Sequence, residues 1–225
     1  MRAFIDFDGV LFDIARHKRE YFRFFERYGI SRIEARREYE KMKKEIGRDD
    51  QKHYISRLKE KHPRLRSEKI LRAIHVFKGK SAPCVYKEAR PFLMKLKRID
   101  FELHLVTSGN KKFQKRKCET SGLMKFFDRI HILENDNKGV FIRGLASPRE
   151  IVVFLDDKQS VVDDVKKHIP RAIILQVARH KSDIRSRRAD KVVRNLREAL
   201  RCIKTRIEKI SRHSGIPLAA GENRK

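Results

Sequence analysis

The pattern of apolar and polar residues changes twice along the chain. Residues 2–5 form a short apolar run of the kind found in a buried strand. From residue 14 to about residue 80, apolar residues recur at helical spacing and no strand pattern stands out. From residue 82 onward, apolar runs typical of strands alternate with segments of helical periodicity. We therefore predict a strand, a helical stretch and an alternating region.

Four helices are predicted in the helical stretch. Ser31 and Glu34 form a capping-box pattern at the start of the second helix. Asp49 or Asp50 is expected to cap the third helix, and Ser67 the fourth. These side chains accept hydrogen bonds from the first N–H groups of a helix, so the stretch is expected to be a small all-α unit.

The alternating region predicts strands separated by helices. The segment "EIVVFLDD" (150–157) is a nearly continuous apolar run, which is typical of a strand that is covered on both faces. Strands are expected over residues 101–107, 129–133, 150–155 and 171–177. Helices are expected over residues 89–99, 110–121 and 159–168, after Lys138, and from the end of the segment "DKVVRN" to about residue 210.

This alternation predicts an α/β fold with a mainly parallel sheet. The helical stretch interrupts the fold after its first strand, so the predicted α/β core is discontinuous. It comprises residues 1–13 and 83–210, with the all-α insert at residues 14–82. Residues 211–225 are expected to form a disordered tail.

The charge of the chain admits two interpretations. It carries 57 Lys and Arg against 30 Asp and Glu, for a formal net charge of +27. Such a balance is typical of nucleic-acid-binding proteins, and the aromatic cluster at residues 21–28 could stack nucleobases or form a helical core. The basic residues are scattered along the whole chain, however, as expected for a solvated basic surface.

Apolar runs and cysteines restrict the class of protein. No apolar run approaches 18 residues, so no transmembrane helix and no membrane partner are expected. The N-terminal segment lacks the apolar core of a signal peptide. The three cysteines are isolated from one another, which disfavours a disulfide framework and suits the cytoplasm.

Polar residues that carry chemistry follow three of the predicted strands. Asp6 and Asp8 come directly after the first strand, while Thr107 and the pair Asp156–Asp157 end two later ones. The carboxyl ends of parallel strands share one edge of a sheet, which is where ligands bind in α/β folds. We therefore expect these side chains to converge.

Four segments in this order resemble the motifs of the haloacid dehalogenase superfamily. They are "DFDGVLFD" (6–13), "LHLVTSG" (103–109), "KGVFIRGL" (138–145) and "VVFLDD" (152–157). The stretch at 107–130, with Gln114 and Lys117, also resembles a linker common in phosphatases of this superfamily. The resemblance implies a Rossmann-like α/β core with a helical cap inserted after the first motif.

The resemblance also implies roles for individual residues. Asp6 would be the nucleophile that forms an aspartyl-phosphate, and Asp8 the general acid and then the general base. The Thr107 hydroxyl, the Ser108 backbone N–H and the Lys138 ammonium would bind the phosphoryl oxygens.

A magnesium ion is implied as the cofactor. Asp6, Asp156 and Asp157 would supply carboxylate oxygens and Asp8 its backbone carbonyl, because oxygen-rich coordination suits Mg²⁺. Which of Asp156 and Asp157 would contact the ion directly stays open.

Other charged residues compete for these roles or are expected to lie outside the site. Lys111 and Lys112 are alternatives to Lys138 as the phosphate-binding lysine. Asp163 and Asp164 fall in the helix after the fourth motif and are expected to be solvated.

The predicted function is Mg²⁺-dependent hydrolysis of a small phosphorylated metabolite or nucleotide. The resemblance implies that the second acid, Asp8, marks phosphoester chemistry, a phosphatase or a phosphomutase, because the dehalogenases of the superfamily lack it and a halide leaves without a proton. The alternative is a basic nucleic-acid-associated protein on the same fold, either a nucleic-acid end phosphatase or a non-catalytic binder. Nonspecific nucleic-acid binding through the basic surface, and a monomer or dimer, are further expectations.

Overall fold

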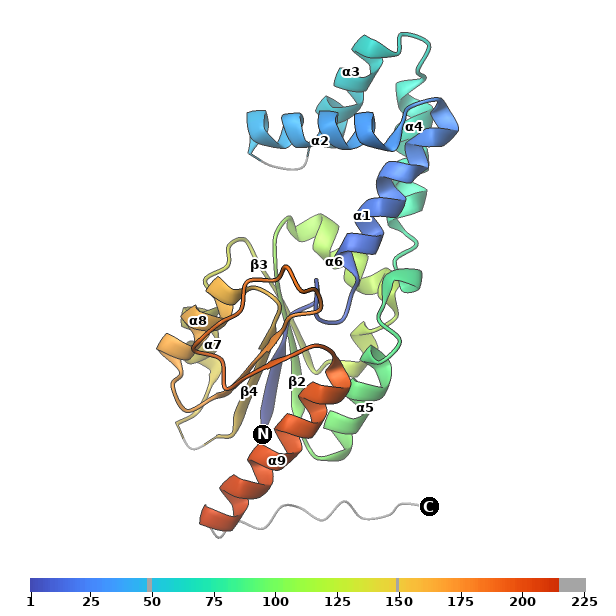
Figure 1. Ribbon diagram of the computed structural model, residues 1–225. Helices are drawn as coiled ribbons and strands as arrows, with labels where there is room; N and C mark the ends of the chain where they lie inside the picture. The colour runs from blue at the N-terminus through green and yellow to red at the C-terminus, as the bar shows by residue number, and fades with distance from the viewer. Residues whose placement is uncertain (48–49, 149, 215–225) are drawn as a thin grey trace, which may run out of the picture. The chain divides into compact units, whose positions relative to one another are not determined.

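The computed structural model describes residues 1–47, 50–148 and 150–214 (Figure 1). The chain divides into two compact units. The first, here called the α/β unit, consists of Met1–Asp13 and the chain from Val85 onward. The second, here called the helical insert, is Ile14–Cys84. Each unit has its own apolar core, so each is described by itself.

The α/β unit is built on a six-stranded sheet in which every neighbouring pair is parallel. This confirms the predicted α/β fold with a mainly parallel sheet. The strand order is β3-β2-β1-β4-β5-β6. The strands are β1 (Arg2–Ile5), β2 (Glu102–Ser108), β3 (Arg129–Leu133), β4 (Val152–Asp156), β5 (Ile173–Val177) and β6 (Lys191–Val193).

The strand order reverses at β1, which lies between β2 and β4. Ile5 is in register with Leu105 on one side and with Leu155 on the other. Asp6 therefore leaves the sheet between two strands that end nearby, and its backbone N–H donates to the Leu155 carbonyl at 2.9 Å. Such a reversal point is where α/β folds bind ligands.

Helices cover both faces of this sheet. Figure 1 shows α7 and α8 on one side and α5 and α9 on the other. Every residue of β4 and β5 is consequently buried, which accounts for their apolar runs. The helices of this unit are α5 (Ala89–Arg98), α6 (Lys111–Ser121), α7 (Lys138–Leu145), α8 (Gln159–His168) and α9 (Leu196–Ser214), with a short 3₁₀ turn η3 (Met124–Phe126). Another 3₁₀ turn, η2 (Ala82–Cys84), ends the helical insert.

The end of the chain and one strand differ from the prediction. Helix α9 continues to Ser214, so residues 211–214 are helical rather than part of a tail. The remaining residues of the predicted tail, 215–225, lie outside the described residues. Strand β6 was not predicted, because three residues are too few to show an alternating pattern. No helix in the described part of the chain is both long and apolar enough to cross a membrane.

The described residues of the helical insert, 14–47 and 50–84, form four α-helices. As predicted, the Ser31 side chain caps the second of them by accepting a hydrogen bond from the Glu34 N–H. The Asp50 side chain caps the third by accepting a hydrogen bond from the His53 N–H. Asp49, the alternative cap, lies outside the described residues. The prediction for Ser67 is wrong, because it is the first residue of its helix. The elements are α1 (Ile14–Arg23), η1 (Phe24–Tyr28), α2 (Arg32–Ile46), α3 (Gln51–Lys61) and α4 (Ser67–Lys78).

Aromatic side chains form the core of the insert. Tyr21, Phe22 and Phe25 are buried; Tyr21 packs edge to face against Phe22 and Phe25, and Phe25 packs in the same way against Tyr54. Tyr54 is fully buried, and its hydroxyl donates to the Ala35 carbonyl at 2.8 Å. The cluster at residues 21–28 therefore serves the packing of the insert, which was the simpler of the two expectations for it.

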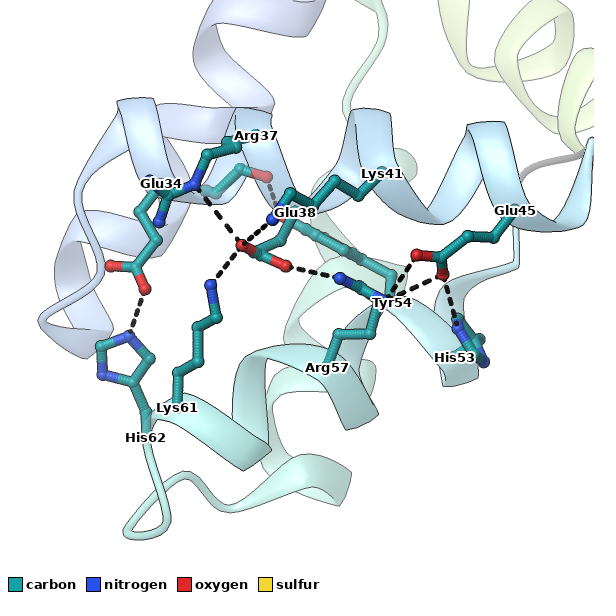
Figure 2. Close-up of polar contacts among 11 residues, drawn as sticks. Glu34, Arg37, Glu38, Lys41, Glu45, His53, Tyr54, Arg57, Lys61 and His62 are labelled. Carbon is teal, nitrogen blue, oxygen red and sulfur yellow. Dashed lines mark hydrogen bonds and ion pairs between the residues drawn. The ribbon is translucent and has the colours of Figure 1, made fainter.

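A fully buried carboxylate joins α2 to α3. Figure 2 shows the Glu38 side chain among four cationic groups. Arg57 donates to it at 3.0 Å, Lys61 also hydrogen-bonds to it, and Arg37 and Lys41 lie 3.5 and 4.0 Å away. The hydrogen bond from Lys61 outweighs the effect of burial and, with Arg57, lowers the pKa of Glu38 to about 2.

Candidate active site

The ends of two neighbouring parallel strands bring three acidic residues together. Asp6 follows β1, Asp156 ends β4, and Asp157 comes next. One carboxylate oxygen from each of these residues lies within 4.8 Å of the others. Asp6 and Asp156 are 5% and 0% exposed, so this group of acids has little water around it.

The charge on this acidic group is poorly compensated. Burial raises the pKa of Asp6 well above its ordinary value; Lys138 opposes this effect, while Asp156, Asp157 and Asp8 add to it. Burial and the neighbouring Asp156 raise the pKa of Asp157 to about 7. The Asp157 Oδ1 atom is buried without a hydrogen-bond partner. Three oxygen donors, one of them unsatisfied, fit a divalent cation such as Mg²⁺.

Lys138 supplies the buried positive charge of this group. Its Nζ lies 2.7 Å from Asp6 Oδ1 and 2.7 Å from Asp156 Oδ2, and the residue is 2% exposed. Burial disfavours the ammonium form, but Asp6 and Asp156 outweigh it and raise the pKa of Lys138. The alternatives, Lys111 and Lys112, are exposed on the first turn of α6.

The start of α7 is fixed by a residue that was expected to be solvated. The Asp164 side chain accepts a hydrogen bond from the Gly139 N–H at 2.9 Å. A Cβ atom at Gly139 would lie 2.5 Å from Asp164 Oδ2, so only glycine allows this close approach. The expectation was therefore wrong for Asp164, which anchors the residue next to Lys138. Asp163 also has partners, Gln159 and Ser186.

The turn after β1 requires a glycine for two reasons. Gly9 has a φ of +75°, in the left-handed region that other residues rarely adopt. A Cβ atom there would lie 2.2 Å from Asp157 Oδ2. The glycine of the first motif therefore makes room for an acid of the fourth motif.

The predicted phosphate-binding residues end the strand beside β1. Thr107 is 1% exposed and lies two residues beyond Leu105, the partner of Ile5. The Ser108 carbonyl accepts a hydrogen bond from the Gln114 side chain at 2.8 Å. These residues are placed at the same edge of the sheet as Asp6.

Asp8 does not join the acidic group through its side chain. Both oxygens of its carboxylate lie 2.6 Å from Lys117 Nζ, and Gln114 Nε2 donates to Oδ2 at 3.1 Å. The sequence indicated Gln114 and Lys117 only as parts of a linker. Their spacing of three on α6, which places them on one face of the helix, was the signal that could have linked them to a single partner.

Arg179 was not found by sequence reasoning. Its guanidinium donates to the carbonyls of Gly9 at 3.0 Å and Val10 at 2.7 Å, pairs with Glu88 at 2.8 Å, and lies 3.4 Å above the ring of Tyr86. It thus ties the segment after β5 to the turn that carries the first motif. A single arginine far from every motif offers no local signal for such a role.

Comparisons with solved structures support the fold. A protein from Burkholderia xenovorans LB400, assigned as a haloacid dehalogenase-like hydrolase, has a TM-score of 0.65 at 21% identity, with coverage of 88% of this chain and 96% of that one. YfnB from Bacillus subtilis, assigned as a hydrolase of the same family and bound to magnesium, has a TM-score of 0.63 at 15% identity, with coverage of 89% and 97%.

A third similar structure belongs to a protein from Thermotoga maritima that is assigned as a β-phosphoglucomutase. Its TM-score is 0.61 at 22% identity, with coverage of 91% of this chain and 99% of that one. No curated protein matches the chain. The profile of haloacid dehalogenase-like hydrolases, however, matches residues 2–158, which include the acidic group, Lys138 and the Asp8–Lys117 pair. The chain therefore belongs to the haloacid dehalogenase-like hydrolase family.

Proposed function

We propose that the protein is a Mg²⁺-dependent phosphatase that hydrolyses small phosphomonoesters. The observation that carries this proposal is the separation of two kinds of carboxylate on one strand end. Asp6 lies in an acidic group that fits a cation. Asp8, two residues later, lies outside that group and pairs with Lys117. A nucleophile beside a cation and a separate proton donor are what the cleavage of a phosphate ester with a poor leaving group requires.

In the proposed reaction, Asp6 attacks the phosphorus atom and forms an aspartyl-phosphate. The bond from phosphorus to the ester oxygen breaks, and Asp8 gives its proton to that oxygen. Water then attacks the aspartyl-phosphate, Asp8 takes the proton of that water, and both aspartates return to their starting states. The cycle needs no other proton donor.

The remaining residues bind charge in this proposal. Asp6, Asp156 and Asp157, with the Asp8 carbonyl, would hold the magnesium ion, which offsets the repulsion between phosphate and carboxylates when bound. Lys138, the Thr107 hydroxyl and the Ser108 N–H would bind the phosphoryl oxygens and stabilise their developing charge. YfnB, a relative of low identity, binds magnesium, which supports the choice of ion.

We further propose that the helical insert is a cap that selects the substrate. It enters the chain directly after the turn of the first motif, between Asp13 and Val85. Its sequence holds 22 Lys and Arg against 10 Asp and Glu, which favours anionic substrates.

Hydrolysis of p-nitrophenyl phosphate with Mg²⁺ and with EDTA tests this function. We expect turnover that EDTA removes, and release of phosphate from some members of a panel of phosphorylated metabolites. Absence of metal-dependent turnover on every substrate would contradict the proposal, and so would full activity of Asp6→Asn.

A second candidate function, nucleic-acid binding, is favoured by one pocket of the insert. This pocket of about 530 Å³ at the turn between α3 and α4 is lined by Tyr28 and five cationic or titratable side chains, with no acidic residue among the described residues around it. The five are Lys61, His62, Arg64, Arg66 and Lys69. Filter binding of single-stranded oligonucleotides across a salt series would test it, because affinity that vanishes at physiological salt indicates only a generic basic surface.

A further inference from the structure

A buried lysine contacts the side chain of Asp8. Lys117 is 1% exposed, and its Nζ lies 2.6 Å from each oxygen of the Asp8 carboxylate, which is itself 25% exposed. Gln114, one helical turn earlier, donates to Asp8 Oδ2 and to the Ser108 carbonyl. Helix α6 thus holds Asp8 from one side and links it to the end of β2.

The surroundings of this lysine are apolar. Its ammonium lies over the rings of Phe7, Phe12 and Phe113, with distances to the ring centroids of 5.5, 5.4 and 5.2 Å. Three aromatic faces favour a cation at this position. Desolvation of an ammonium nevertheless costs several kcal/mol unless it has a charged partner, and Asp8 is that partner. The arrangement ties the lysine to one carboxylate.

The contacts also restrict the orientation of the Asp8 carboxylate. An ammonium and an amide N–H₂ group can only donate hydrogen bonds. The three hydrogen bonds that reach the carboxylate from α6 all come from such donors. Donors from one helix thus contact both oxygens of the carboxylate, which fixes its orientation relative to α6.

We propose that Lys117 is a positioning residue that holds the Asp8 side chain in place for proton transfer to the leaving group. It holds the carboxylate apart from the acidic group of Asp6, Asp156 and Asp157, and it does so from the α6 side. This inference rests on the proposed phosphatase function and deepens it.

The test compares two substrates that differ in their leaving groups. p-Nitrophenolate leaves without a proton, whereas the alkoxide of glycerol 2-phosphate needs one. The ratio kcat/KM reports the first chemical step. For Lys117→Met we expect kcat/KM to fall about tenfold or more further for glycerol 2-phosphate than for p-nitrophenyl phosphate.

Three variants make the result specific. Lys115→Met removes an exposed lysine from the same helix and should leave the ratio between the two substrates unchanged. Asp8→Asn should show the same preferential fall in kcat/KM for glycerol 2-phosphate, to at least the extent that Lys117→Met does. Lys117→Met added to Asp8→Asn should then change the ratio no further, because the two side chains act through one proton. If Lys117→Met fails to fold, Lys117→Gln tests the same point with a neutral donor.

The outcomes separate this inference from the function on which it rests. If the Lys117 variants lose equal factors of kcat/KM on both substrates, Lys117 has a structural role only and the inference is overturned. The phosphatase function would still stand in that case, because it rests on the activity of the wild-type protein. A wild-type protein that hydrolyses neither substrate would overturn both.

Discussion

The helical insert and the α/β unit each bury carboxylates, and they compensate their charge in opposite ways. In the insert, one carboxylate, Glu38, has four cationic groups within 4.0 Å (Figure 2). In the α/β unit, three carboxylates lie together, and the buried ammonium of Lys138 pairs with two of them, Asp6 and Asp156. The pKa of Glu38 is accordingly lowered to about 2, whereas that of Asp157 is raised to about 7.

This difference separates a structural cluster from a functional one. A buried carboxylate that is fully paired has no unused capacity for a ligand, so Glu38 holds α2 and α3 together. A group of acids with too few cations is unstable by itself and gains by binding one. The sign of the uncompensated charge, rather than burial alone, marks the acidic group as a site.

The largest expected effect is that of Asp6→Asn. Loss of the nucleophile should reduce kcat by about 10³-fold or more. The same change removes one of three repelling acids, so the melting temperature of the metal-free protein should not fall. Steady-state kinetics and thermal unfolding in EDTA measure the two effects, and a large drop in melting temperature would break the contrast with Glu38.

The two clusters should respond to pH with opposite signs. The folded pKa of Asp157, about 7, is raised above an unfolded value of about 4, so the metal-free protein loses stability as pH rises from about 4 to 7. One such group contributes at most about 4 kcal/mol over this range. The folded pKa of Glu38, about 2, is lowered, so its contribution is lost as pH falls below about 4.

Urea unfolding in EDTA at several pH values measures this dependence. Asp157→Asn should flatten the decline in the free energy of unfolding between pH 4 and 7, and Glu38→Gln should leave that decline unchanged. A variant at Asp157 with the wild-type pH dependence would contradict the assignment of the titrating group.

Removal of the Glu38 charge should destabilise the insert. Glu38→Gln leaves four cations without their carboxylate; because these are partly exposed, we expect a loss of about 2–3 kcal/mol rather than the full cost of a broken buried pair. The matched control, Glu40→Gln, removes an exposed ion pair with Arg36 on the same helix and should cost about 0–0.5 kcal/mol.

Tyrosine fluorescence is a suitable probe for this measurement. The chain has no tryptophan and five tyrosines, of which all but Tyr86 belong to the insert. Equal effects of the Glu38 and Glu40 substitutions on the urea transition would show that the buried network does not stabilise the insert.

The smallest expected effect concerns the glycine of the first motif. Gly9→Ala forces a positive φ on alanine and places Cβ against Asp157, so we expect a loss of about 1–2 kcal/mol and weaker Mg²⁺ binding. Gly144→Ala is the control, since its added Cβ would meet no described atom within 4 Å other than its chain neighbours and its own helix backbone, and alanine favours the helix. Thermal unfolding with and without Mg²⁺ compares them, and equal shifts would contradict the close approach.

The sequence predicted most of the fold because its signals are local. Apolar periodicity located the helices and five of the six strands, and side-chain caps such as Ser31 located helix starts. β6 was missed because an edge strand of three residues has no pattern of its own. Ser67 was misplaced by one position because a serine is tolerated both at a cap and within the first turn.

For the candidate site, the sequence indicated the residues at strand ends but not their partners. Asp6, Asp156 and Lys138 were expected to lie together. In the structure, Lys138 Nζ lies 2.7 Å from a carboxylate oxygen of each aspartate. Asp164 was expected in solvent and instead fixes the start of α7. Contacts between helices depend on how the helices pack, which no short segment encodes.

The amino-acid sequence by itself determined the alternation of strands and helices, the place of the insert and the order of acids along the chain. Only the tertiary structure decided which acid pairs with which lysine. Asp8 and Lys117 are more than a hundred residues apart, and their pairing exists because α6 packs beside β2, the neighbour of β1. Two aspartates that look alike in "DFDG" therefore differ physically: Asp6 shares Lys138 with a group of repelling acids, whereas Asp8 has a buried lysine to itself.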